Sequence, residues 1–226
     1  HALHQIDKWC EALEGEMDKA PRVRAVVRGI RAARFVLEAS ATPFGPAREN
    51  LAGRAIETYR RLVNDPDLSN DPLSVETRAN MAIALLNFAE GVRPELALAR
   101  LEEAAQLSDS LRAMADPVAR ASAALTASNV RRDLAPLKPQ DQRRDVLDLA
   151  IRDAEAAIHG FGELGNEEGR LLAMRALGHS HMDRAMLEGA GPDAERHARE
   201  SFSALEFCVA RFDRSRSLGL WFKAAH

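Results

Sequence analysis

The side chains best suited to binding chemistry lie between residues 175 and 183. His179 and Asp183 are four residues apart, so on a helix they share one face and could provide two ligands to a metal ion, with Arg175 on the same face. His181 would point about 200° away from His179 and cannot join that site. We favour the alternative in which His181 packs in the core and His179 and Asp183 form an ordinary surface pair.

A second group is a stripe of arginines at spacings of four and three residues, Arg24, Arg28 and Arg31. Aligned guanidinium groups could hold an acidic peptide or a phosphate by bidentate hydrogen bonds. The alternative, which we favour, is a solvated helix face whose charges are balanced by carboxylates of the preceding segment. Those carboxylates are Glu11, Glu14, Glu16 and Asp18.

Motifs typical of enzymes are missing from the 226 residues. The chain has neither a glycine-rich phosphate loop nor a dinucleotide-binding glycine pattern. It also lacks the zinc-protease motif, the helical di-iron pattern and the serine nucleophile elbow. We therefore expect no catalytic activity, no cofactor and no resident metal.

The charge and the apolar runs exclude two further classes of protein. With 31 basic and 34 acidic side chains the formal charge is −3, which gives no general attraction to nucleic acid or to an anionic membrane. No uncharged apolar run approaches the roughly 18 residues that a membrane span needs.

These residues must be positioned by helices. Aromatic residues make up only 5% of a chain rich in Ala, Leu, Arg and Glu, a balance that favours helix over strand. Prolines and glycines separate stretches with apolar residues at intervals of three and four, which predicts an all-α fold. The expected helices are 2–17, 21–41, 46–63, 72–90, 94–114, 117–134, 141–162, 167–188, 192–212 and one from 215.

The helices also repeat in pairs. Pro21, Pro72, Pro117, Glu167 and Arg214 begin alternate helices at intervals of 45 to 51 residues. The intervening helices carry a small residue, a second residue four positions on, and a third residue three further on, all on one face. These triplets are Ala55/Tyr59/Leu62, Ala97/Leu101/Ala104, Ala150/Ala154/Ala157 and Ala198/Phe202/Leu205, and Ile6/Cys10/Leu13 fits the same pattern.

The segment Ala198 to Leu205, with Leu177-Gly178 before it, resembles the tetratricopeptide repeat (TPR). His181 stands where that motif usually has Tyr, and longer helices account for a period above the usual length of about 34 residues. The resemblance implies a right-handed α-α superhelix, a solenoid of about ten antiparallel helices forming one domain over 1–226. Its units would be 21–71, 72–116, 117–166 and 167–213. Long Ala- and Arg-rich arrays of this kind resemble those attached to bacterial CHAT caspase-like proteases and signalling ATPases.

In TPR-like solenoids the first helix of each pair lines a concave groove that contacts peptides. By that resemblance the groove candidates are Asn80, Asn87, Asn129, Arg132, Arg175, His179 and Asp183. Asn and Arg side chains could grip a peptide backbone or a terminal carboxylate. We therefore expect a non-catalytic scaffold that binds a peptide, a protein or a neighbouring domain, as a regulatory module of a larger bacterial signalling or effector protein. The alternative is a sensor of a small ligand or metal, with a pocket around Arg175, His179 and Asp183.

The remaining expectations concern the cell compartment and the chain ends. Cys10 and Cys208 lie nearly the whole chain apart inside apolar patterns, so we expect buried, reduced thiols. No signal-peptide pattern opens the sequence, and we expect a cytoplasmic protein. A first residue other than Met and an apolar end at 217–222 suggest one part of a longer polypeptide.

Overall fold

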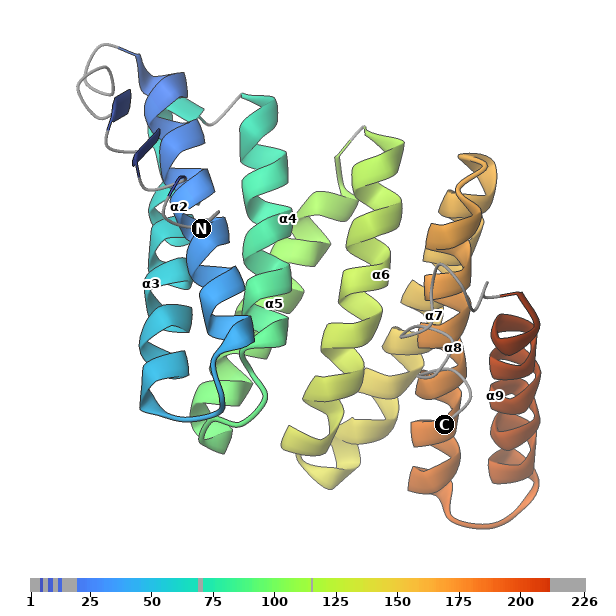
Figure 1. Cartoon of the computed structure of the whole chain (residues 1–226). Coiled ribbons are helices and arrows are strands. Elements are labelled where there is room, and N and C mark those ends of the chain that lie inside the picture. Colours follow the sequence, from blue (N-terminus) through green and yellow to red (C-terminus); the bar gives the residue numbers. More distant parts are fainter. Residues whose placement is uncertain are drawn as a thin grey trace. The chain divides into compact units, whose positions relative to one another are not determined.

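The helices follow the punctuation of the sequence closely. The computed structural model describes residues 20–68, 71–114 and 116–211, with a few isolated positions before residue 20. Within these residues every regular element is a helix, which confirms the all-α class (Figure 1). The elements are α2 (Pro21–Ala41), α3 (Pro46–Val63), η1 (Pro66–Leu68), α4 (Pro72–Asn87), α5 (Pro94–Arg112), α6 (Pro117–Leu134), η2 (Ala135–Leu137), α7 (Gln140–Glu163), α8 (Glu167–Glu188) and α9 (Pro192–Arg211).

Local capping explains where helices begin. Asp71 and Asp116 each accept a hydrogen bond from a backbone N–H two residues on, at 2.9 and 3.1 Å, and a proline follows each of them. The ends were predicted less well, since α4 and α5 stop two to three residues before the expected positions. The helices expected over 2–17 and from 215 lie outside the part of the chain described in full.

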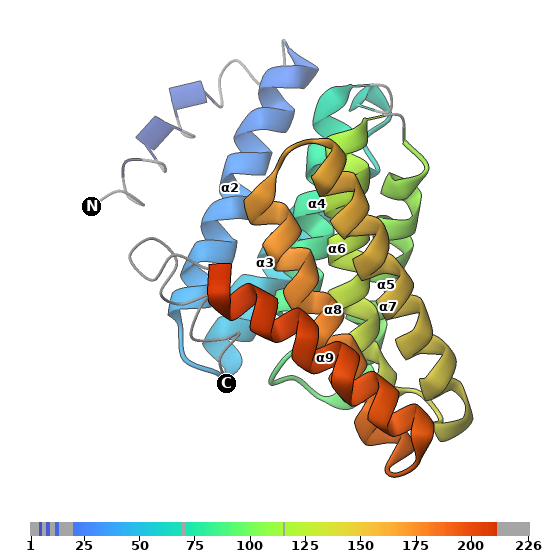
Figure 2. The ribbon, with the colours of Figure 1, turned by 90° about the vertical axis from the view of Figure 1, so that its right-hand side faces the viewer.

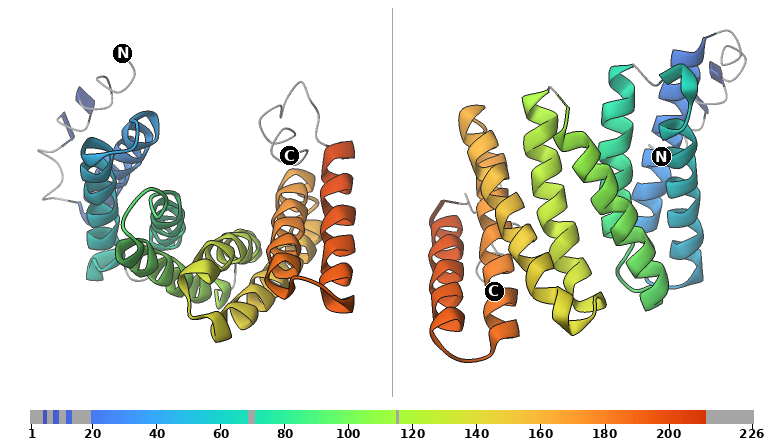
Figure 3. Two further views of the ribbon diagram at one scale, coloured as in Figure 1. Left: turned by 90° about the horizontal axis from the view of Figure 1, so that it is seen from below. Right: turned by 180° about the vertical axis from the view of Figure 1, so that it is seen from behind.

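The chain divides into two compact units, one ending at Leu107 and one starting at Ser108, so the boundary falls inside α5. In unit 1, α2 packs on α3 and α3 on α4. In unit 2, α6, α7, α8 and α9 pack on one another in chain order, and α6 also contacts α8. Figure 2 shows α9 lying over α8, and Figure 3 shows the consecutive helices of unit 2 from below.

The predicted triplets form much of the core. Each residue of the triplets in α3, α5 and α7 is at most 7% exposed. In unit 2, Ala157 and Phe161 of α7 pack between Ala121 and Ala124 of α6 and Ala173 of α8. Small residues at these positions allow the close helix approach that the spacing predicted.

The triplet of α9 is different. Phe202 is 66% exposed and Ala198 is also exposed, whereas Leu205 is half-buried. The buried face of α9 is instead Ala194, His197, Ser201, Ala204 and Cys208. The physical reason is that α9 is the last helix described, so only the face toward α8 meets a neighbour within the described residues.

The expectations about the burial of His181 and Cys208 are confirmed. His181 is 8% exposed and Cys208 is fully buried, as predicted, and Phe88 is 2% exposed. Cys10 lies outside the described residues. No described helix is both long enough and apolar enough to cross a bilayer.

Candidate binding surface on α6 and α8

Two neighbouring helices of unit 2 bring four of the predicted groove residues together. Arg132 stands near the end of α6, and Arg175, His179 and Asp183 lie on successive turns of α8. Arg132 Nε lies 3.9 Å from Asp183 Oδ2, and its charge acts on Arg175 and His179 as well. We call these four residues the α6–α8 surface.

The two arginines of this surface differ in their partners. Arg132 donates two hydrogen bonds, of 3.2 and 2.9 Å, to its sequence neighbour Asp133. Arg175 is half-buried, and its Nη1 is buried yet makes no hydrogen bond with any residue that the structure describes. A buried guanidinium nitrogen without an acceptor costs free energy.

Burial and like charges shape the electrostatics. Burial, and then Arg132, lower the pKa of Arg175. The pKa of His179 is lowered by burial first and then by Arg132 and Arg175, so its imidazole is neutral at pH 7. Burial is the first cause of both shifts, and the positive charge of Arg132 adds to it.

Asp183 is the one carboxylate of the surface. Burial raises its pKa, Asp133 raises it further, and Arg132 acts in the opposite direction. A cation at His179 and Asp183 would lie beside Arg132 and Arg175, which disfavours the metal-sensor alternative electrostatically. Among the residues that the structure describes, no group of three or more His, Cys, Asp or Glu side chains converges as a metal site would require.

The three asparagines predicted to line the groove offer less to a common binding site than expected. The side-chain nitrogen of Asn129 donates to the carbonyl of Leu125 on its own helix, at 3.2 Å, so one of its two N–H groups is already used. Asn80 and Asn87 are exposed on α4, two turns apart, and belong to unit 1. The three asparagines are therefore spread over both units.

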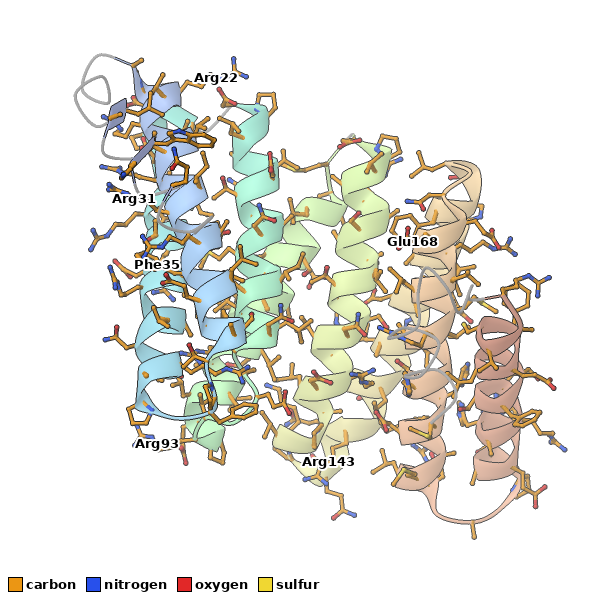
Figure 4. All side chains as sticks on the ribbon, viewed as in Figure 1. Arg22, Arg31, Phe35, Arg93, Arg143 and Glu168 are labelled. Atoms are coloured by element: carbon orange, nitrogen blue, oxygen red, sulfur yellow. The ribbon has the colours of Figure 1, made fainter. Side chains whose placement is uncertain are left out.

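The basic stripe of α2 has carboxylate partners at its start. Arg24 donates to Asp67 at 2.9 Å and lies 3.7 Å from Asp65, both near η1. Arg28 and Arg31 are half-buried further along α2, where Figure 4 labels Arg31. The acidic partners expected at residues 11 to 18 lie outside the described side chains.

Two buried polar clusters were missed by the sequence patterns. His181 of α8 and His197 of α9 face each other with their Nδ1 atoms 2.8 Å apart. Asp153 of α7, 1% exposed, binds both Arg131 of α6 and Arg112 of α5, and Arg131 also binds Asp109 at 2.7 and 2.8 Å. The available signal was a charged residue on an apolar helix face, since Asp153 lies between Ala150 and Ala157 in the core register.

No protein-family model and no curated protein sequence matches this chain. Its function is therefore inferred from the geometry and electrostatics of the surfaces described above.

Proposed function

We propose that this chain is a non-catalytic interaction module that binds an acidic segment of a protein or peptide at the α6–α8 surface. The observation that carries the proposal is that two half-buried arginines from different helices, Arg132 and Arg175, lie close enough for their charges to interact. A carboxylate placed there would receive charge-assisted hydrogen bonds.

The stacking of helices in chain order, with small-residue triplets in the core, supports a TPR-like helical repeat as the framework. In this proposal the partner is a separate protein or a neighbouring domain of the same polypeptide. By the same resemblance the module regulates a larger bacterial signalling or effector protein in the cytoplasm. Binding at the α6–α8 surface would then compete with, or stabilise, one state of that protein.

The test is capture of partners from a cell lysate with the wild type and with Arg132→Glu/Arg175→Glu, followed by titration of the captured partner. We expect the double charge reversal to weaken binding by about 100-fold or more, since like charges then face the ligand. The matched control is Arg152→Glu/Arg199→Glu, which makes the same charge change at exposed positions of α7 and α9. Equal loss of binding in both variants, with unchanged circular dichroism, would show only a general charge effect and reject the surface.

A second measurement tests the same surface through His179. An anion beside His179 favours its protonated form, so binding and protonation strengthen each other. We expect affinity to rise as the pH falls from about 7.5 to about 5.5 and this dependence to weaken in His179→Gln. If His179→Gln shows the same pH dependence of affinity as the wild type, the ligand does not bind beside His179.

A further inference from the structure

An open cavity of about 420 Å³ lies at one end of unit 1. Its walls are the loop between α2 and α3 and the loop between α4 and α5, and Figure 4 shows Arg93 at this end of the unit. The volume is within the range of small-molecule sites. Sequence periodicity does not reveal the cavity, because two separate loops form it.

Phe44 provides an exposed but fixed aromatic wall. Its side chain is 58% exposed, and the guanidinium carbon of Arg48 lies 4.0 Å from its ring centroid. The ring also packs on Gly91, where φ is +77° and a Cβ would overlap the ring. The ring is thus held between Arg48 and Gly91, and its exposed part and Leu96 contribute apolar lining to the cavity.

One residue that lines the cavity, Glu49, is paired with a buried arginine. Arg100 is 6% exposed and donates to Glu49 at 3.2 Å and to the backbone carbonyl of Phe88. Glu49 lines the cavity, but its charge is balanced by Arg100. The Glu49–Arg100 pair therefore adds no net charge to the cavity.

Apart from the Glu49–Arg100 pair, the charged residues that line the cavity have a net positive charge. The other charged lining residues are Arg48, Arg93 and Glu90. The cavity is also bordered by Gly45 and Pro46, where α3 begins without a side-chain cap, and by Arg93, which precedes α5. The same two loops also carry the negative ends of α2 and α4, so the two arginines provide the positive charge of the cavity.

We propose that this cavity binds a small carboxylate with an aromatic or branched aliphatic body. The apolar body lies against Phe44 and Leu96, and the carboxylate accepts hydrogen bonds from Arg48 and Arg93. This site is independent of the α6–α8 surface, so each proposal can fail without affecting the other.

The test is calorimetric titration of the full chain with phenylacetate, isovalerate and phenylacetamide. Phenylacetamide matches phenylacetate in shape but lacks the charge. We expect saturable binding of both acids and at least about tenfold weaker binding of the amide, because only the acids form charge-assisted hydrogen bonds. Amide resonances of Gly91 and Leu96 in NMR spectra should shift on addition of phenylacetate, which localises the ligand.

The variant Arg48→Gln/Arg93→Gln should weaken phenylacetate binding by about tenfold or more and leave phenylacetamide unchanged. Arg22→Gln/Arg61→Gln is the matched control, since both arginines are 72% exposed and neither lines the cavity. The proposal is overturned by any of three results: no saturation with either acid up to about 10 mM, equal affinity for acid and amide, or unchanged phenylacetate binding in the Arg48/Arg93 variant.

Discussion

At the scale of single residues, buried charges and imidazoles connect the helices of unit 2. Arg184 of α8 is 6% exposed and donates to Asp148 of α7 at 2.8 Å and to Glu188 on its own helix. Asp153 is paired in the same way with arginines of two other helices. Such pairs give little net stability when complete, but a buried charge left without its partner is costly.

The buried carboxylate of Asp153 should be important for stability. Asp153→Asn keeps the shape of the side chain but leaves Arg131 and Arg112 facing a neutral group, so we expect a loss of about 3 kcal/mol in the free energy of unfolding. Asp145→Asn makes the same change at an exposed position of α7 and should alter that free energy by less than about 0.5 kcal/mol. Urea unfolding measures the free energy of unfolding of both variants. Equal losses would mean that the buried Asp153 is no more sensitive to loss of its charge than the exposed Asp145.

The facing histidines predict how stability depends on pH. The pKa of His181 is lowered by burial first and then by His197 and Arg196, while Glu200 and Asp148 oppose this. The pKa of His197 is lowered by burial first and then by Arg196 and Arg184, against Asp148 and Asp193. The unfolded chain thus takes up protons before the folded chain does, and stability is lost as the pH falls below about 6.5.

His197→Asn should reduce that loss, because asparagine keeps a nitrogen near the Nδ1 position but does not titrate. We expect the difference in unfolding free energy between about pH 7.5 and pH 5 to shrink by roughly 1 kcal/mol or more. The control is His159→Asn, at a position whose side chain is 78% exposed. An undiminished difference in His197→Asn would show that other groups set the acid sensitivity.

At the scale of helices, close approach between neighbours depends on small residues at the contact points. Gly178 of α8 faces Leu205 and the carbonyl of Ser201 on α9, and a Cβ there would lie 2.7 Å from Leu205 Cγ. Gly162 in the last turn of α7 has open space around it. Close packing therefore explains the glycine at position 178, whereas no contact explains the glycine at position 162.

Substitution of the two glycines by alanine should have opposite effects. Gly178→Ala forces α8 and α9 apart, and we expect a loss of about 1 to 3 kcal/mol in unfolding free energy. Gly162→Ala meets no neighbour and gains helix propensity, so it should stabilise by about 0.5 to 1 kcal/mol. Thermal and urea unfolding of the pair measure this, and a stabilising Gly178→Ala would disprove the tight α8–α9 contact.

At the scale of the whole molecule, two compact units share one helix, α5, and within each unit the helices contact mainly their sequence neighbours. Chains built this way open locally, because a perturbation is transmitted only through adjacent helices. We therefore expect each unit to have its own free energy of unfolding.

Hydrogen exchange should reveal this independence. In Gly178→Ala, amides of α8 and α9 should exchange faster by about tenfold or more, while those of α2 and α3 change little. Peptide-resolved mass spectrometry of wild type and variant gives the comparison. A uniform increase along the chain would mean that the molecule unfolds as a single cooperative body.

The sequence by itself determined the helical class, most helix boundaries and the buried triplets of α3, α5 and α7, because periodicity and proline or aspartate caps act within a few residues. It also selected Arg132, Arg175, His179 and Asp183 as candidates. Which side chains pair was decided only by the tertiary structure. His181 meets His197 16 residues away, and Asp153 meets Arg131 22 residues away and Arg112 41 residues away. Periodicity fixes the face of a helix on which a residue lies, but helix packing and loop conformation decide what that face meets, as in the cavity beside Phe44 and Arg93.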